Sequence, residues 1–344
     1  MEFEVLDILN KNGFESYIVG GYVRDNILNK KTVDVDFTTS ATLTDLKKLF
    51  DVTSENYGSV KIKYKNKAYE ITTFRKEFFY INYRYPKKIK FTKNVKSDLK
   101  RRDFTINALL MNKDKKIIDY VGGISDIENR CIRMIGNPKK RLKQDSLRIL
   151  RAIRFATILN FKLDKKLELY IKKYGYLLKY LSYDRKKQEL DKIFSSSNAM
   201  YGISLLKNLE LDKYLEIDLN NIIYFPDLNY MWAQIGCSKY NFNRKDEKKI
   251  KRIKECLTKD ILDKMVVYNY GIEMCLNVAK IKSINEDLLL NLFKSLPIKN
   301  RSEIDYDLSS INKKIIEDIE FKIVALNLKN NKNEIKKYIK QHYM

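Results

Sequence analysis

Two carboxylates, Asp34 and Asp36, stand on either side of a single valine in the β-prone segment 32–38. Because successive side chains of a strand point to opposite faces, a strand here would place both carboxylates on the same face. Neighbouring carboxylates repel each other unless they face water or share a cation. Oxygen ligands of this kind suit Mg²⁺, which completes its coordination shell with waters and substrate phosphates. The pair therefore indicates either a metal site or a solvated edge strand.

A glycine pair, Gly20 and Gly21, follows the apolar run 17–19 and precedes a helical pattern that contains Arg24. The order of strand, tight turn and helix start leaves backbone N–H groups available to bind an anion such as a phosphate. A simple turn is the alternative for the glycines alone. A phosphate-binding turn followed so closely by a divalent-cation site, however, describes a nucleoside triphosphate site for metal-assisted phosphoryl transfer.

The next segment, 59–75, alternates in the manner of a β-hairpin. Its second strand carries Glu70, which can point to the same face as the two aspartates. It is then either a third carboxylate of the site or a surface glutamate. The aromatic-rich segment 76–86, which contains Arg84, is expected to form a loop between two strands.

A helix is predicted to begin near Asn137–Pro138 and to continue through the segment that starts at Leu142. At 100° per residue, the apolar side chains Ile149, Leu150 and Ile153 gather on one side. The opposite half carries Asp145, Arg148, Arg151 and Arg154. This charged face is either solvated and salt-bridged, or a binding surface in which Asp145 and Arg148 are neighbours that act as a unit.

An aspartate acceptor beside an arginine donor would select among nucleobases. Cytosine and adenine each present an amino donor beside a ring-nitrogen acceptor, so Asp145 and Arg148 can pair with both. Guanine and uracil present a carbonyl oxygen and a ring N–H there, which would leave both side chains mispaired at about 1–3 kcal/mol for each unsatisfied group. The pair therefore predicts selection of C and A without a nucleic-acid template.

The chain has 344 residues, of which 44% are hydrophobic and 33% are charged, and a formal net charge of +24. This length allows two or more packed domains. The positive charge indicates a polyanionic partner, although a genome biased toward lysine, asparagine and isoleucine would also produce it. The single histidine is His342, so a mechanism that needs a histidine base or a histidine-bound metal is not expected.

The four cysteines are far apart and form no C-x-x-C pair, which predicts reduced, mostly buried thiols rather than a zinc site. They are Cys131, Cys237, Cys256 and Cys275. The amino terminus carries acidic residues and lacks the apolar core of a signal peptide, and no apolar run is long enough to span a membrane. These features predict a cytoplasmic protein.

The glycine turn followed by D-x-D resembles the signature of the DNA polymerase β nucleotidyltransferase superfamily. The form G-G-x-V-R-D at 20–25 narrows the resemblance to the class II tRNA nucleotidyltransferases and bacterial poly(A) polymerases. Residues 101–108, R-R-D-F-T-I-N-A, are similar to a family motif whose second arginine, here Arg102, contacts the triphosphate. Residues 144–148, Q-D-S-L-R, are similar to the base-reading E-D-x-x-R motif. Gln144 replaces its glutamate and offers only a neutral hydrogen bond for orienting the arginine, which predicts either less strict base selection or a less strict switch from C to A.

The resemblance implies an α+β fold with a small mixed-sheet nucleotidyltransferase head at 1–136. A helical neck with the base-reading helix is expected at 137–198, and a helical, tRNA-binding body and tail at 199–344. The implied reaction adds C, C and A to the 3′ end of tRNA from CTP and ATP and releases pyrophosphate. A poly(A) polymerase or an enzyme that adds only A is one alternative, and a non-catalytic, basic RNA-binding protein is another. The oligomeric state is not predicted.

The same resemblance assigns roles to individual residues. Asp34 and Asp36 would hold Mg²⁺, and Glu70 falls where the family has a glutamate on the strand beside the D-x-D. The other assigned residues are Gly21, Arg24 and Arg102 for the phosphates, Asp145 and Arg148 for the base, and Arg151 and Arg154 for supporting the nucleotide and the primer end.

Overall fold

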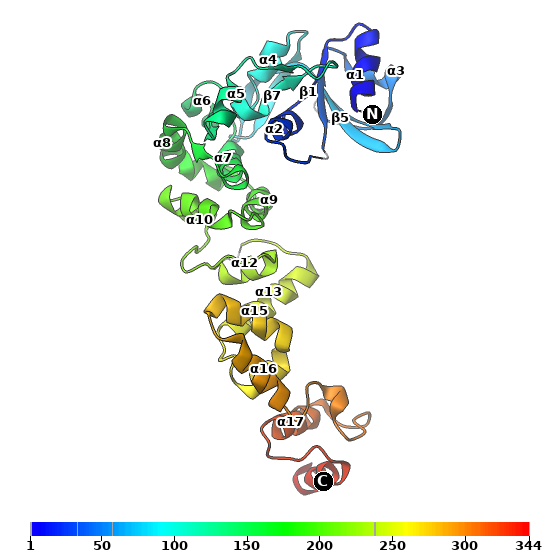
Figure 1. The fold of residues 1–344 in the computed structure, drawn as a ribbon, viewed down its shortest axis with the longest axis vertical. Helices are drawn as coiled ribbons and strands as arrows, with labels where there is room; N and C mark the ends of the chain where they lie inside the picture. The colour runs from blue at the N-terminus through cyan, green and yellow to red at the C-terminus, as the bar shows by residue number, and fades with distance from the viewer. Residues whose placement is uncertain (1, 33, 57, 237–238, 344) are drawn as a thin grey trace. The chain divides into compact units, whose positions relative to one another are not determined.

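The computed structural model describes residues 2–32, 34–56, 58–236 and 239–343. The chain forms two compact units, Met1–Leu219 and Asn220–Met344, which Figure 1 shows in their order along the chain. A mixed β-sheet followed by helices makes up the first unit, and helices make up the second, which confirms the predicted α+β fold. The divisions predicted after residues 136 and 198 both fall inside the first unit and stay predictions.

The described residues of the first unit contain a seven-stranded sheet. Its strands, in spatial order, are β3 (Asp51–Asn56), β4 (Ser59–Tyr64), β5 (Lys67–Thr73), β2 (Asp36–Thr39), β1 (Ser16–Val19), β8 (Leu110–Met111) and β9 (Ile117–Ile118). Strand β2 runs antiparallel to β1 and parallel to β5. Asp36, its first residue, therefore lies between Val19 of β1 and Glu70 of β5.

The strand that was predicted over 32–38 begins only at Asp36, so Asp34 precedes the sheet and the prediction of one strand carrying both carboxylates was wrong. The cause lies in the neighbouring strand. Chain segment 16–19 leaves the sheet at Gly20, where α2 (Gly21–Ile27) begins, and no residue of β1 remains to pair with the chain before Asp36.

The predicted hairpin over 59–75 is confirmed, since β4 and β5 pair as neighbouring antiparallel strands. Its turn residues Lys65 and Asn66 have φ values of 46° and 65°. Two consecutive left-handed residues are typical of the tight turns whose twist matches that of the strands they join. The hairpin places Glu70 opposite Lys61, and the parallel pairing of β5 with β2 places it beside Asp36.

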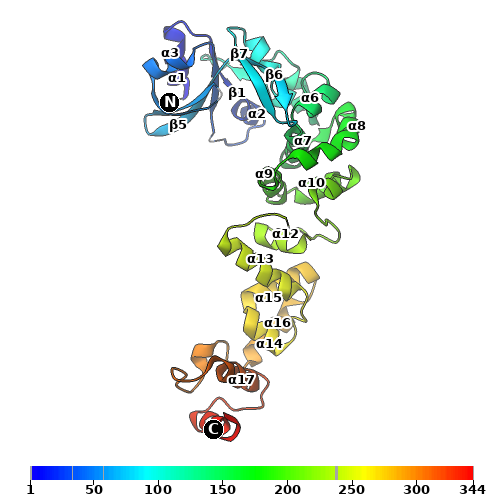
Figure 2. The same cartoon turned by 180° about the vertical axis from the view of Figure 1, so that it is seen from behind.

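The segment 76–86 is not the predicted loop. It belongs to a separate antiparallel ribbon of β6 (Arg75–Ile81) and β7 (Tyr85–Phe91), which Figure 2 shows side by side. Side chains alternate along the first four residues of β6: Glu77 is half-buried, whereas Lys76 and Phe78 are exposed, and the alternation breaks at the exposed Phe79. This short alternation is typical of a strand with one face packed on protein, and the aromatic residues obscured it in the sequence.

Helices cover the sheet and continue beyond it. Those of the first unit are α1 (Glu2–Lys11), α2, α3 (Leu43–Leu49), α4 (Val95–Leu99), α5 (Gly123–Glu128), α6 (Pro138–Gln144), α7 (Leu147–Leu159), α8 (Lys165–Tyr174), α9 (Tyr183–Phe194), α10 (Ala199–Asn208) and α11 (Asp212–Leu215). Short 3₁₀ turns lie at Thr105–Asn107 and Gly175–Tyr180, and β10 (Cys131–Ile132) pairs in parallel with β11 (Lys162–Leu163).

The helix predicted from Asn137 is interrupted and forms two helices, α6 and α7. Asp145 lies at the break in an extended conformation, with φ −142° and ψ 103°. Its carboxylate accepts the backbone N–H of Leu147 at 3.1 Å. Aspartate side chains often compete in this way with helical hydrogen bonds and begin a new helix. The predicted apolar face of α7 is confirmed, because Ile149, Leu150 and Ile153 are fully buried.

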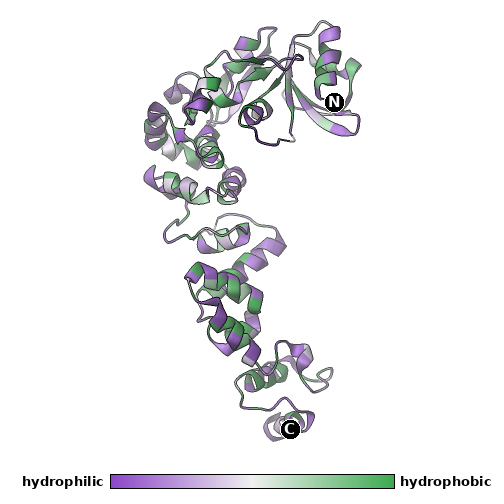
Figure 3. Ribbon diagram, viewed as in Figure 1, coloured by the Kyte–Doolittle hydropathy of each residue, from purple (hydrophilic) through white to green (hydrophobic). Residues whose placement is uncertain are grey.

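The second unit has its own core, built from the apolar faces of its helices. These helices are α12 (Leu228–Gln234), α13 (Arg244–Leu257), α14 (Lys264–Tyr270), α15 (Ile272–Lys282), α16 (Glu286–Ser295), α17 (Lys313–Val324) and α18 (Lys332–Tyr343), with a 3₁₀ turn at Arg301–Glu303. Hydrophobic and hydrophilic residues alternate within individual helices in Figure 3. This pattern is typical of amphipathic helices that pack on one another.

The cysteine prediction is confirmed for the residues that can be tested. Cys131, Cys256 and Cys275 are buried free thiols, and Cys237 lies outside the described residues. Over the described parts of the chain, no helix combines the length and the apolar composition needed to cross a membrane.

Close packing at Gly123 fixes the 3₁₀ turn Thr105–Asn107, whose Asn107 side chain contacts Arg24. A Cβ atom on Gly123 would lie 2.4 Å from the backbone oxygen of Thr105. Because a backbone atom cannot rotate away, we expect Gly123→Ala to lower the free energy of unfolding by about 1–3 kcal/mol. Thermal unfolding of the full-length protein measures the effect, with the exposed Ser125→Ala on the same helix as the control. Equal melting temperatures for the two variants would contradict the close contact.

Candidate active site

A cavity of about 650 Å³ opens in the first unit between the glycine turn, the segment after α4 and the start of α7. All the predicted site residues except Glu70 line it. They are Gly21, Arg24, Asp34, Asp36, Arg102, Asp145, Arg148, Arg151 and Arg154. Tertiary structure thus brings together residues from the sheet, the turn and the helices that are far apart in the sequence.

The glycine turn forms one wall of this cavity. Gly20 has a φ of 84°, a backbone conformation that glycine adopts without strain, and α2 begins directly after it. Arg24 of α2 is only 8% exposed and extends into the site. Its guanidinium donates to Asp25 Oδ1 at 2.8 Å and to Asn107 Oδ1 at 2.7 Å. These two acceptors fix the position of the cation next to the turn.

The carboxylates lie where this cavity meets a smaller one of about 350 Å³, which Asp34, Asp36 and Glu70 line together. Asp36 reaches solvent, but the surrounding protein still displaces enough water to raise its pKa. The charge of Glu70 raises that pKa further, Asp34 adds to the effect, and Arg102 opposes it. Negative charge therefore accumulates here beyond what the protein itself neutralises.

The carboxylates fit a metal ion that is only partly coordinated by protein. The described residues include no group of three or more His, Cys, Asp or Glu side chains arranged to hold a metal. Two carboxylates with unmatched charge nevertheless suit Mg²⁺, which takes one or two protein carboxylates and fills its remaining positions with water and substrate phosphate. The residues present therefore fit a metal that is shared with a substrate, and do not form a closed structural site.

Sequence reasoning missed the acids that hold the arginines of the cleft. Asp103 accepts from Nε of Arg151 at 2.6 Å. Burial alone would raise the pKa of Asp103, but Arg151 and the N–H of Phe104 outweigh it and lower that pKa to about 2. Arg154 donates to the buried Glu189 at 3.1 Å. Asp103 was visible within the R-R-D motif, whereas nothing in the sequence connects Glu189 to Arg154.

An aromatic ring also separates these cations. The side chain of Phe155 lines the cavity, and the guanidinium carbons of Arg24, Arg151 and Arg154 lie 5.4, 5.4 and 4.3 Å from its centroid. A ring face attracts cations. Phe155 therefore spaces the three guanidinium groups around one wall of the cavity.

The structure corrects the predicted Asp145–Arg148 unit. Both residues border the cavity, but Asp145 lies before α7 and its carboxylate binds Arg84, whose Nη1 is 2.8 and 2.7 Å from the two oxygens. Arg148 instead donates Nη1 to the backbone oxygen of Arg141 at 2.9 Å and Nη2 to that of Arg101 at 3.3 Å. Each member of the pair is positioned by a partner of its own.

Arg84 belongs to the tip of the β6–β7 ribbon, which docks on the α6–α7 junction. The backbone oxygen of Tyr83 accepts the N–H of Ser146 at 2.8 Å, and the Tyr83 ring lies 4.7 Å from that of Tyr180. These contacts, together with the Arg84–Asp145 ion pair, form a latch that holds the ribbon tip next to Asp145. The sequence gives no sign of them, because the partners are sixty or more positions apart in the chain.

Known proteins are similar to this chain over nearly its whole length. The model of the poly(A) polymerase head domain matches residues 16–133, and that of a probable RNA and SrmB-binding site of polymerase A matches residues 160–219. The chain is 32% identical to the CCA-adding enzyme of Staphylococcus saprophyticus, over 98% of this chain and 96% of that protein. It is 30% identical to the CCA-adding enzyme of Bacillus cytotoxicus, over 98% and 97%.

Solved structures agree with these alignments. The Bacillus stearothermophilus CCA-adding enzyme in complex with CTP superimposes with a TM-score of 0.78 at 26% identity, over 99% of this chain and 96% of that chain. The Thermotoga maritima CCA-adding enzyme in complex with tRNA has a TM-score of 0.71 at 19% identity, over 99% and 94%, and shares the fold.

The latch formed by Arg84 makes a prediction about local stability. We expect Arg84→Met to increase hydrogen exchange at the ribbon tip and at Ser146 by about tenfold, because the loss of one charge-assisted contact reduces the free energy of local opening. Mass spectrometry of peptides that span 80–86 and 144–148 provides the measurement. The exposed Lys87→Met on the same ribbon is the control. If both variants exchanged like the wild type, the Arg84–Asp145 contact would not contribute to the local stability of the ribbon tip.

The raised pKa of Asp36 predicts how stability responds to its charge. The folded state binds a proton at Asp36 more tightly than the unfolded state does, so stability falls as pH rises through this pKa. Asp36→Asn should therefore raise the melting temperature of the metal-free protein at pH 7. Asp51→Asn, at an exposed carboxylate of β3, should leave it unchanged. A lower melting temperature for Asp36→Asn would show that the charge of Asp36 stabilises the fold, and would contradict the raised pKa.

Proposed function

The chain belongs to the CCA-adding enzyme family, and we propose that the cleft of its first unit carries out the addition of C, C and A to the 3′ end of tRNA from CTP and ATP, with release of pyrophosphate. One observation carries the assignment of the cleft. The glycine turn, the paired carboxylates and the two predicted base-reading residues all line a single cavity. Phosphate, metal and base binding can therefore act on the same nucleotide.

Base selection is assigned to Asp145 and Arg148. Asp145 can accept the amino group of cytosine or adenine, and Arg148 can donate to the adjacent ring nitrogen. The carboxylate of Asp145 has about four acceptor positions, of which Arg84 and the N–H of Leu147 occupy some. The base therefore either shares this carboxylate with Arg84 or displaces it.

Phosphate binding is assigned to the N–H groups at Gly21 and to the cations Arg24 and Arg102. Arg151 and Arg154 support the nucleotide and the primer end, since Asp103 and Glu189 hold them in place at the cavity wall. Arginine is suited to this task because its planar guanidinium can bind a phosphate through two parallel hydrogen bonds.

Metal dependence is general for this family, and we assign the metal of this chain as Mg²⁺ held by Asp34 and Asp36, with Glu70 beside them. When bound, Mg²⁺ would lower the pKa of the RNA 3′-hydroxyl and neutralise charge on the triphosphate. Asp34 and Asp36 line the same cavity as the glycine turn, so the metal would lie near the phosphates bound there. Glu70, opposite Asp36 in the parallel register, adds negative charge from the neighbouring strand.

Contact with tRNA is assigned to the helical parts of the chain. Residues 160–219 match the model of a probable RNA-binding region, which supports RNA binding by the neck and the start of the body. The boundaries of head, neck and body at 136 and 198, and the cytoplasmic location, belong to the same proposal.

Separate-triphosphate assays test the proposal. The wild type should add C to tRNA that ends before CCA, and A to tRNA that ends in CC. Asp34→Asn and Asp36→Asn should each lower incorporation by about 10³-fold or more while the protein stays folded, because each removes a metal ligand. Asp51→Asn is the matched control.

The outcomes separate the competing functions. Incorporation of A without C would favour an enzyme that adds only A or a poly(A) polymerase. Absence of Mg²⁺-dependent pyrophosphate release with either triphosphate would favour a non-catalytic RNA-binding protein. Wild-type turnover by either aspartate variant would defeat the metal assignment.

A further inference from the structure

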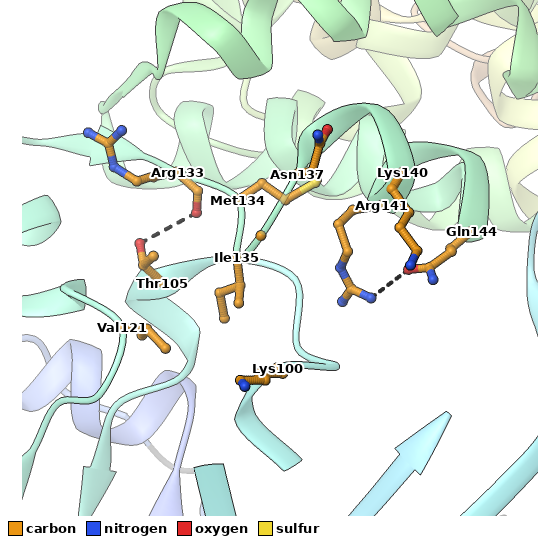
Figure 4. A pocket seen from close by; sticks show the side chains of 11 residues that line it. Lys100, Thr105, Val121, Arg133, Met134, Ile135, Asn137, Lys140, Arg141 and Gln144 are labelled. Carbon is orange, nitrogen blue, oxygen red and sulfur yellow. Dashed lines mark hydrogen bonds between the residues drawn. The ribbon is translucent and has the colours of Figure 1, made fainter. Parts of the chain in front are cut away.

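Arg141 of α6 does not line the cleft but contacts three arginines that do: Arg101, Arg102 and Arg148. Arg141 and Gln144 border a separate cavity of about 690 Å³, shown in Figure 4. Arg141 is 9% exposed, although it carries a charge. Neither residue has a role in the proposed reaction, and burial of a cation is costly unless it is matched by good partners. Its partners therefore indicate what it does.

The partners of the Arg141 side chain are neutral. Its Nη2 donates to the backbone oxygens of Arg101 and Arg102 at 2.5 and 2.7 Å. Its Nη1 donates to Gln144 Oε1 at 2.7 Å, the contact drawn as a dashed line in Figure 4. Among the ion pairs of the described residues none involves Arg141, and its Nε is buried without a partner. Burial, and then the charge of Arg148, lower the pKa of Arg141 to about 10.

The same residue holds Arg148 through its main chain. Arg148 is 5% exposed and donates to the backbone oxygens of Arg141 and Arg101. The Arg101 oxygen thus receives both guanidinium groups, one from each helix. Two acceptors behind a planar guanidinium fix its plane, and the remaining N–H groups are left for a ligand. Arg148, Arg141 and the backbone of Arg101–Arg102 therefore form one hydrogen-bond network.

The contact of Gln144 changes the interpretation of its substitution. The sequence predicts that residue 144 acts on the base-reading arginine directly. In the structure, Gln144 borders the separate cavity of Figure 4 and its side chain accepts a hydrogen bond from Arg141. Any effect of Gln144 on base reading must then pass through Arg141. A glutamate has nearly the same shape as glutamine and would add the negative charge that Arg141 lacks.

We propose that Arg141 is a positioning residue for base selection: it fixes the plane of Arg148 and the backbone of Arg101–Arg102, and Gln144 sets how firmly it does so. This inference rests on the proposed function of the cleft. It makes fidelity, meaning the preference for CTP over UTP, depend on residues that do not touch the nucleotide. A neutral partner at 144 leaves Arg141 held by hydrogen bonds alone and lowers that preference.

The test measures kcat/KM for CTP and for UTP on tRNA that ends before CCA. Arg141→Lys keeps the charge but loses the planar set of donors, and we expect the CTP:UTP ratio to fall by about tenfold. Gln144→Glu supplies the missing charge, and the ratio should rise by about threefold or more. The KM for tRNA should stay within about twofold in both variants, since neither residue is assigned to RNA binding.

Lys140→Met is the matched control, because Lys140 lies on the same helix, borders the same cavity and is exposed. Its CTP:UTP ratio should equal that of the wild type. If Arg141→Lys lowered both activities equally and Gln144→Glu left the ratio unchanged, Arg141 would have only a structural role and the inference would fall. Should Arg141→Lys fail to fold, as melting curves would reveal, the ratio of Gln144→Glu alone decides. Failure of the wild type to incorporate CTP would instead overturn the proposed function.

Discussion

One buried carboxylate, Asp98, joins the elements that surround the cleft. It is fully buried and accepts hydrogen bonds from Thr38 of β2, from the backbone N–H of Arg75 on β6 and from the guanidinium of Arg101. Burial raises the pKa of Asp98, but the charges of Arg102 and Arg101 outweigh it and hold that pKa below its ordinary value. The ionised form is therefore the stable one in the folded protein. The sheet, the ribbon and the R-R-D segment all depend on this single charge for their mutual position.

The other arginines of the cleft are also held by fixed acceptors. Without them, several cations would repel one another in the cavity before any phosphate binds. Acidic side chains hold Arg151 and Arg154, and backbone oxygens hold Arg148. Breaking such a buried pair leaves an uncompensated charge, which is far more costly than losing an exposed one. Each cation is thereby kept in a defined orientation while part of its surface stays directed into the cavity. Preorganised cations of this kind stabilise charge without rearranging during the reaction.

Prediction from the sequence succeeded where the signal was local. The strand, glycine turn and helix at 16–27, the hairpin turn at Lys65 and the apolar face of α7 all depend on residues that are near one another in the chain. It failed at boundaries that distant partners decide. The strand at Asp36 begins where β1 ends, and the helix breaks at Asp145 because a side chain competes with the backbone. The segment 76–86, which lies in the β6–β7 ribbon, is predicted as a loop because its aromatic residues hide the strand pattern in the sequence.

The sequence by itself determined the chemical groups and their local order: a glycine turn, a D-x-D pair, an R-R-D-F segment and an aspartate three residues before an arginine. These types, with the family resemblance they carry, were enough to expect nucleotidyl transfer with C and A. Only the tertiary structure decided which acid holds which arginine. Asp145 binds Arg84 rather than Arg148, and Glu189 of α9 binds Arg154 of α7. The physical reason is that a guanidinium pairs with whichever acceptor the fold brings within about 3 Å, and sequence spacing specifies such neighbours only within one helix or strand.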